Sequence, residues 1–175
     1  MTLSKHSAQL FTIANRLVDS ANRLTHLGQD DIVLGERREP LTFFKSRSSL
    51  TVNYAFFQVI AMRAQAIEAD TVFGVNFHET TRDGGMTDAE IEAALGDGHI
   101  MDESTSCALV AEMISVRESG KPGLLHSHGL ANLFYTSALV VNVTWYAADG
   151  VWIVDTSGRS GDRWRRGSRI FTLRR

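Results

Sequence analysis

Apolar residues recur at helical spacing in the first part of the chain. From Ser4 to Leu27 they fall three or four positions apart, which gathers them on one face and predicts an amphipathic helix. A second long helix is predicted over residues 50–67, where the apolar face is broad and Ser48 or Ser49 can serve as the cap. We therefore expect the chain to begin with two helices that pack into its core.

The segment between these two predicted helices lacks a clear secondary-structure signal, whereas the segment after residue 86 carries strong helix-capping signals. Residues 29–47 show no sustained period and predict a long loop with a short extended piece at residues 41–44. Further on, Thr87 and Glu90 have the spacing of a capping box, and Gly96 follows the last apolar residue. These signals predict a third helix that begins at Thr87 and ends at Gly96.

Short runs of β-branched and aromatic residues dominate the remaining sequence and predict strands. A turn at residues 148–150 separates two of these runs, as in an antiparallel hairpin. The predicted strands cover residues 71–77, 123–128, 138–146, 151–156 and 168–173.

The segment Cys107–Arg117 can be interpreted in two ways. Its Ala, Leu, Glu and Met residues favour a helix that ends before Gly120, whereas its β-branched residues also suit a strand. We favour the helix. The whole pattern predicts a single α+β domain over residues 1–175, with N-terminal helices followed by a C-terminal antiparallel sheet.

Composition supports an ordinary globular chain. With 175 residues and 43% apolar content, the chain can bury a full core, and its single cysteine excludes an intrachain disulfide. No apolar run is long enough to span a membrane, and residues 1–16 lack the order of a secretory signal. We expect a cytoplasmic protein without membrane contact, and export without a cleavable signal stays open.

Charge limits the class of partner. A formal net charge of -2 argues against general nucleic-acid binding, although the C-terminal end is locally basic. That end can meet phosphate or an acidic partner, or it can be a solvated strand edge that resists pairing. The sequence does not specify an oligomeric state. The arginines concerned are Arg163, Arg165, Arg166, Arg169, Arg174 and Arg175.

Cys107 is the main candidate for chemistry. At the start of a helix, the unpaired amides and the helix dipole would stabilise its thiolate, with Ser104, Thr105 or Ser106 as the cap. A thiolate needs a histidine to handle its proton and a carboxylate to orient that histidine. His126 or His128 can supply the base and Asp155 the orienting acid, and the sequence does not choose between the two histidines. The alternative places Cys107 in the core as a packing residue.

The run Val141–Thr156 resembles the strand, turn and strand that carry the acid in papain-like and transglutaminase-like cysteine enzymes. The resemblance covers the chain from Cys107 onward and implies amide hydrolysis, deamidation or acyl transfer, with Cys107 as nucleophile and Asp155 as orienting acid. The chain departs from the family at Ser137 and Ala138, where the family has its histidine, so His126 or His128 would have to substitute.

If the Cys107 segment is instead a strand, the layout resembles the smaller glutamine deamidases. In those enzymes a Ser-Cys pair faces a downstream histidine, and the matching positions here are Ser106, Cys107 and His126. The reaction class implied by this resemblance is again amide hydrolysis.

A metal site is the second interpretation of the two histidines. His126 and His128 have the spacing of a metal-binding pair, as in cupins and some zinc peptidases, but Thr136 and Leu139 occupy positions where the peptidases need ligands. The other candidate ligands are His78, Glu79, His99 and Asp102.

A third interpretation is a non-enzymatic protein-binding module. It would use Trp145, Trp152, Trp164 and the basic C-terminal end as its contact surface, because aromatic and arginine side chains are common anchors. Two glycine-rich pieces, at residues 83–85 and 157–161, do not match a phosphate-binding loop, and we expect no bound cofactor. The predicted function is a thiol-dependent amide hydrolase, a cysteine peptidase or deamidase, with the metal and binding alternatives left open.

Overall fold

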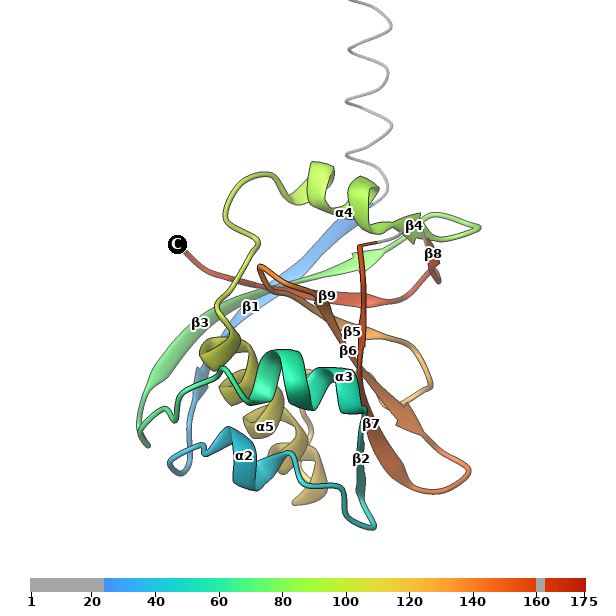
Figure 1. Ribbon diagram of the computed structural model, residues 1–175. Coiled ribbons are helices and arrows are strands. Elements are labelled where there is room, and N and C mark those ends of the chain that lie inside the picture. The colour runs from blue at the N-terminus through green and yellow to red at the C-terminus, as the bar shows by residue number, and fades with distance from the viewer. Residues whose placement is uncertain (1–23, 160–162) are drawn as a thin grey trace, which may run out of the picture.

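A large mixed β-sheet dominates the computed structural model, which describes residues 24–159 and 163–175 (Figure 1). Seven strands are ordered β1-β3-β9-β5-β6-β7-β2, and a separate two-stranded sheet pairs β4 with β8. Most neighbours are antiparallel, but β5 runs parallel to β9 and β2 runs parallel to β7. The strands are β1 (Leu24–Val33), β2 (Leu50–Val52), β3 (Val72–Thr80), β4 (Met86–Thr87), β5 (Asn132–Tyr135), β6 (Val140–Tyr146), β7 (Val151–Ser157), β8 (Arg163–Trp164) and β9 (Arg169–Leu173).

The helices lie between strands in the chain and form two groups in space. One group covers a face of the sheet beside β2 and β7, and α4 lies at the opposite end near β4 and β8 (Figure 1). A π-helix directly continues α3. The helices are α2 (Pro40–Phe43), α3 (Tyr54–Phe56), η1 (Phe57–Ala61), α4 (Asp88–Leu95) and α5 (Glu103–Glu118). None of the helices in the described part of the chain is long and apolar enough to cross a membrane.

The predicted order of helices first and an antiparallel sheet last is wrong. The sheet is mixed, it includes strands from both ends of the described chain, and the helices are interspersed among them. Most of the first predicted helix lies outside the described residues, but its end, from Leu24 to Leu27, belongs to strand β1. The alternation of inward and outward side chains in β1 is interrupted by a register shift between His26 and Gly28, which obscures the strand period in the sequence.

The second predicted helix is also different in the structure. Residues 50–52 form the edge strand β2, and Asn53 then caps α3 by accepting a hydrogen bond from the backbone N–H of Ala55 at 2.7 Å. The helical segment ends at Ala61 rather than residue 67. Residues 40–43 are helical, so the short extended piece predicted at residues 41–44 is wrong; Pro40 occupies the first helical position, where its missing N–H costs nothing.

Several local predictions are confirmed. The capping box of Thr87 and Glu90 starts α4, and Gly96 ends it with a positive φ of 70°. The segment around Cys107 is helical, as favoured, although it begins earlier than expected, with Asp102 as the cap. Strands β3, β6, β7 and β9 match predicted runs, whereas residues 123–128 form a loop and not a strand.

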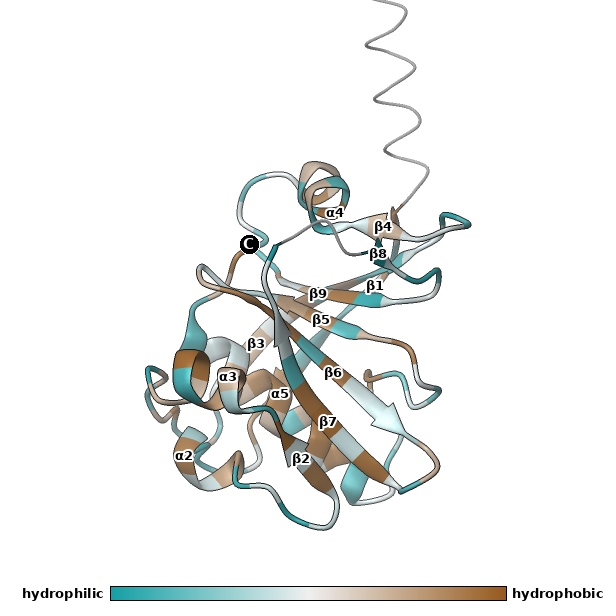
Figure 2. Ribbon diagram, turned by 45° about the vertical axis from the view of Figure 1, so that its right-hand side comes forward, coloured by the Kyte–Doolittle hydropathy of each residue, from teal (hydrophilic) through white to brown (hydrophobic). Residues whose placement is uncertain are grey.

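Helix α5 is the centre of the main core. Residues 105–114 are all buried, so nearly every side of its middle turns is covered by the sheet or by the α2 and α3 segments. Phe134 of β5 and Phe171 of β9 stack beneath it with ring centroids 4.9 Å apart. Figure 2 shows apolar residues gathered along β7 and β2, where these strands meet the helices. This packing fixes the loop that follows α5, where the histidine pair lies.

Candidate ligand-binding site

Cys107 lies inside the core. It is the fifth residue of α5, and its side chain is 1% exposed. Burial raises the pKa of its thiol, and the negative charges of Glu103 and Asp102 raise it further. The first turn of the helix is therefore acidic where the predicted thiolate needs positive charge. This position favours a neutral thiol that packs as a small apolar side chain.

Hydrogen bonds between the backbone of His126 and the side chain of Asn132 fix the position of His126. Its N–H donates to Asn132 Oδ1 at 2.8 Å, and Asn132 Nδ2 donates back to the His126 carbonyl at 3.3 Å. The ring Nε2 lies 3.7 Å from Glu79 Oε2. Burial lowers the pKa of the imidazole, the charge of Arg169 lowers it further, and Glu79 acts in the opposite direction. His126 therefore faces strand β3 and its glutamate.

The other two predicted site residues lie elsewhere. His128 is exposed, and Asp155 is half-buried on β7, where its Oδ1 accepts the backbone N–H of Thr156 at 2.7 Å. Within residues 24–159 and 163–175, no hydrogen bond or ion pair joins Cys107 to His126, His128 or Asp155. The Cys-His-Asp site stays a prediction that these contacts do not support.

The candidate metal ligands are also dispersed. In the described part of the chain, no group of three or more His, Cys, Asp or Glu residues is arranged to hold a metal ion. His78 lies beside His26, with ring centroids 5.0 Å apart, while Asp102 caps α5. His99 Nε2 lies 3.7 Å from Glu92 Oε1. His78 and His99 line one hollow, whereas Asp102 lies at the start of α5, so these residues do not form one set of ligands.

The middle residue of the histidine pair contributes to a hollow. Ser127 Oγ accepts a hydrogen bond from Arg117 Nη2 at 2.7 Å, and both side chains line a hollow of about 650 Å³. We call it the Arg117 hollow. It lies among the end of α5, the loop after it, and the β6–β7 hairpin, and its lining residues are Ser49, Arg117, Glu118, Ser127, Trp145 and Trp152.

Two tryptophans form the apolar wall of the Arg117 hollow. Trp145 of β6 and Trp152 of β7 are direct cross-strand partners, with ring centroids 5.1 Å apart and planes inclined by 57°. Trp152 is 2% exposed and anchors the pair in the core, whereas Trp145 is only partly buried. The indole of Trp145 is therefore accessible to a ligand beside Arg117.

Space for the Arg117 side chain depends on a glycine. A Cβ at Gly123 would lie 2.9 Å from Arg117 Cδ and 3.4 Å from Val116 Cγ1. These distances place the aliphatic stem of Arg117 directly against the loop backbone. The close approach limits the directions in which the guanidinium can extend.

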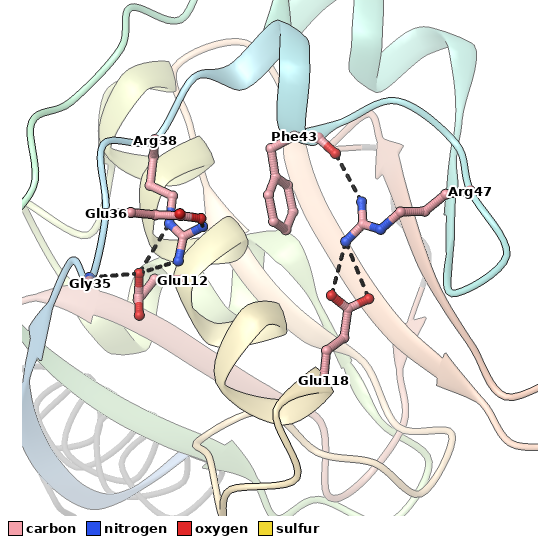
Figure 3. A network of polar contacts seen from close by, with 7 residues as sticks. All are labelled: Gly35, Glu36, Arg38, Phe43, Arg47, Glu112 and Glu118. Carbon is pink, nitrogen blue, oxygen red and sulfur yellow. Dashed lines mark hydrogen bonds and ion pairs between the residues drawn. The ribbon is translucent and has the colours of Figure 1, made fainter.

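A second arginine, Arg47, neutralises the carboxylate that lines the Arg117 hollow. The Glu118 carboxylate pairs with Arg47, whose Nη2 lies 3.0 Å from Oε2 (Figure 3). The pairing offsets the negative charge of Glu118. Among the described residues, Arg117 donates a hydrogen bond to the neutral Ser127 and forms no ion pair with a carboxylate. The hollow therefore favours an anionic group.

A polar clamp holds the segment that contains Arg47 against α5. Arg38 donates to Glu112 Oε2 from Nε at 3.0 Å and from Nη2 at 2.5 Å, and Gly35 N–H reaches the same oxygen at 3.1 Å. The ring of Phe43 lies between the two arginines, and Figure 3 shows the Arg38 and Arg47 pairs on either side of it. This clamp places Arg47 beside Glu118.

Sequence reasoning identified the tryptophans but missed Arg117 and Ser127. The predicted turn at residues 148–150 was a usable signal, because a four-residue connection between β6 and β7 places Trp145 opposite Trp152. No comparable local signal brings Arg117 to them, since it approaches from the end of α5.

A comparison of the chain with protein families, with curated proteins and with solved structures found no match.

Proposed function

We propose that this protein binds a small molecule that carries an anionic group on a flat aromatic body, and that the Arg117 hollow is the site. The observation that carries the proposal is the Arg117 guanidinium, without an acidic partner among the described residues, beside the exposed part of the Trp145–Trp152 pair. A guanidinium binds a carboxylate through two parallel hydrogen bonds, and an indole face stacks against an aromatic ring.

The size and chemistry of the Arg117 hollow support binding. Its volume of about 650 Å³ falls within the range of roughly 300–1,000 Å³ that is typical of small-molecule sites. The lining contains neither histidine nor cysteine, the residues most used in acid–base and thiol catalysis, and its carboxylate is already paired with Arg47. These features favour retention of a ligand over chemical conversion.

The first prediction concerns affinity for an aromatic carboxylate. Naphthalene-1-carboxylate is the probe, and its neutral amide is the matched control ligand. We expect calorimetry to show weaker binding of the carboxylate to Arg117→Gln than to the unchanged protein, by about tenfold, or ~1.4 kcal/mol, because one charge-assisted contact is lost. The neutral amide should bind the two proteins alike.

Arg63→Gln is the matched protein control. Arg63 is exposed and is not among the residues that line the Arg117 hollow, so its replacement removes the same charge elsewhere. Equal loss of affinity in the Arg63 and Arg117 variants would reduce the effect to net charge and contradict the proposal. Binding of carboxylate and amide with the same affinity would contradict the role of Arg117.

A further inference from the structure

A second hollow lies on the opposite face of β6. It has a volume of about 340 Å³ and occupies the space between the loop before β5 and the turn that joins β8 to β9. Side chains alternate along a strand, so Asn142 and Thr144 point away from the face that carries Trp145. We call it the Arg165 hollow. The lining residues important here are Asn142, Thr144, Arg163, Trp164, Arg165 and Ser168.

Arg165 supplies a positive charge that no ion pair offsets within the described residues. The arginines on either side of it form ion pairs: Arg163 Nη1 lies 3.5 Å from Glu90 Oε2, and Arg166 Nη1 lies 2.7 Å from Asp83 Oδ1. Arg174 likewise pairs with Asp31. The basic C-terminal end is therefore partly neutralised by internal ion pairs, and Arg165 contributes its charge to the Arg165 hollow.

The backbone beneath Arg165 is fixed. Its carbonyl accepts hydrogen bonds from Thr80 Oγ1 at 2.7 Å and from the backbone N–H of Ser168 at 3.0 Å. A Cβ at Gly167, where φ is 88°, would lie 2.9 Å from Leu130 Cδ1, so the turn packs closely on the opposite wall. The position of the arginine is thus set by the fold, and its side chain can be shortened without removing these contacts.

The Arg165 hollow also offers hydrogen-bonding groups. Ser168 is 1% exposed, and its Oγ has no hydrogen-bond partner among the described residues. A buried hydroxyl without a partner costs free energy that a ligand can recover. Thr144 Oγ1 donates to Asn142 Oδ1 at 3.1 Å, which leaves the Asn142 amide nitrogen as a donor.

We propose that the Arg165 hollow binds the phosphomonoester of a small polyhydroxyl compound, with the phosphate against Arg163 and Arg165. A volume of about 340 Å³ exceeds the need of a bare phosphate ion. The remaining space faces Ser168, Asn142 and Thr144, whose polar groups match sugar hydroxyls. This site is separate from the Arg117 hollow and does not depend on the function proposed for it.

Two acidic residues act against the phosphate. Asp155 is the cross-strand partner of Asn142 and shares its face of the sheet, and Glu90 offsets part of the charge of Arg163. Binding is therefore expected to depend strongly on the free charge of Arg165 and to weaken as salt screens it.

The test uses ribose 5-phosphate, with ribose as the uncharged control, in calorimetric titrations of the whole protein at low ionic strength. We expect Arg165→Ala to weaken ribose 5-phosphate binding by about tenfold or more, and Ser168→Ala to weaken it by a smaller factor. Arg166→Ala is the matched control, because Arg166 follows directly in the chain, is paired with Asp83, and does not line the Arg165 hollow. That variant should retain the original affinity.

Three results would overturn the proposal. The first is equal loss of affinity in the Arg165 and Arg166 variants, which would indicate general attraction to a basic surface. The second is equal binding of ribose and ribose 5-phosphate. The third is Arg165-dependent binding of single-stranded DNA without binding of ribose 5-phosphate, which would make this surface a nucleic-acid contact.

Discussion

Cys107 is surrounded by the buried middle of α5, and its environment disfavours ionisation at the scale of a single residue. Burial raises the pKa of the thiol, and the carboxylates of Glu103 and Asp102 act in the same direction. Alkylating reagents attack the thiolate, so both its scarcity and its 1% exposure slow the reaction. A reactive cysteine would need the opposite environment.

We expect iodoacetamide to modify Cys107 at least about a hundredfold more slowly in the native protein than in the urea-unfolded chain at the same pH. The measurement is the alkylation rate followed by mass spectrometry. The unfolded chain serves as its own control, since Cys107 is the only cysteine. Rapid alkylation of the folded protein near neutral pH would instead support the predicted Cys-His site.

The role of a residue could be predicted from the sequence where residues close to it in the chain form its environment. Thr87 and Glu90 are three residues apart and form their capping box locally. Cys107 and His126 have no such local relation, because the distance between them is set by the packing of α5 on the sheet. For the same reason, Ser127 became notable only when the structure placed it against Arg117.

At the scale of elements, the clamp between the α2 segment and α5 contains two arginine–glutamate pairs in different environments. The side chains of Arg38 and Glu112 are 6% and 9% exposed, whereas those of Arg47 and Glu118 are 35% and 28% exposed. Without Glu112, the buried Arg38 guanidinium would keep only Glu36, a mostly exposed carboxylate 2.5 Å from its Nη1. A buried charge that loses a buried partner is poorly solvated, while an exposed one is solvated readily.

We therefore expect Glu112→Gln to lower the free energy of unfolding by about 3 kcal/mol, and Glu118→Gln to lower it by less than about 1 kcal/mol. Urea denaturation monitored by circular dichroism measures both. The Glu118 variant is a matched control because it changes the same group on the same helix. Similar losses in the two variants would show that burial does not determine the strength of this clamp.

Elements were predictable when their signals were local and strong. The capping box marked α4, and strands β3, β6, β7 and β9 are runs of β-branched and aromatic residues. The edge strands β1 and β2 and the short central strand β5 were missed. Seven of the ten positions in β1 are exposed, so the strand lacks an apolar face, and β2 is only three residues long and precedes a helix with apolar residues. Tertiary pairing, not local pattern, makes these segments strands.

For the whole molecule, two half-buried histidines link stability to pH. Burial lowers the pKa of His78, with a further contribution from His26, and burial and Arg169 lower the pKa of His126. As the pH falls below the ordinary value of 6.5, the unfolded chain takes up these protons more readily than the folded chain, which favours unfolding. Stability should be constant above this value and decrease below it.

The urea concentration at the midpoint of unfolding is therefore expected to decrease as the pH is lowered from about 7.5 to about 5.5. Replacing His78 and His126 together by Gln should flatten this part of the profile. His128→Gln is the control, because His128 is exposed. If the urea midpoint of the double variant still decreased as steeply with falling pH, at pH values above those where carboxylates titrate, these histidines would have no role in the pH dependence.

The order of the sheet could not be predicted from the sequence. Strand β9 inserts between β3 and β5, and β2 pairs in parallel with β7 at the far edge, so these neighbours in the sheet are distant in the chain. The two proposed sites arise from this arrangement. Strand β6 contributes Trp145 to the Arg117 hollow on one face and Asn142 and Thr144 to the Arg165 hollow on the other.

The three tryptophans allow one measurement to locate the ligand directly. Trp145 and Trp152 line the Arg117 hollow, and Trp164 lines the Arg165 hollow. In ¹⁵N-labelled protein, their indole N–H groups give separate signals that substitution of each tryptophan by Phe can assign. Titration with naphthalene-1-carboxylate should shift the signals of Trp145 and Trp152 and leave that of Trp164 in place. A shift of Trp164 alone, or of none of the three, would contradict binding at the Arg117 hollow.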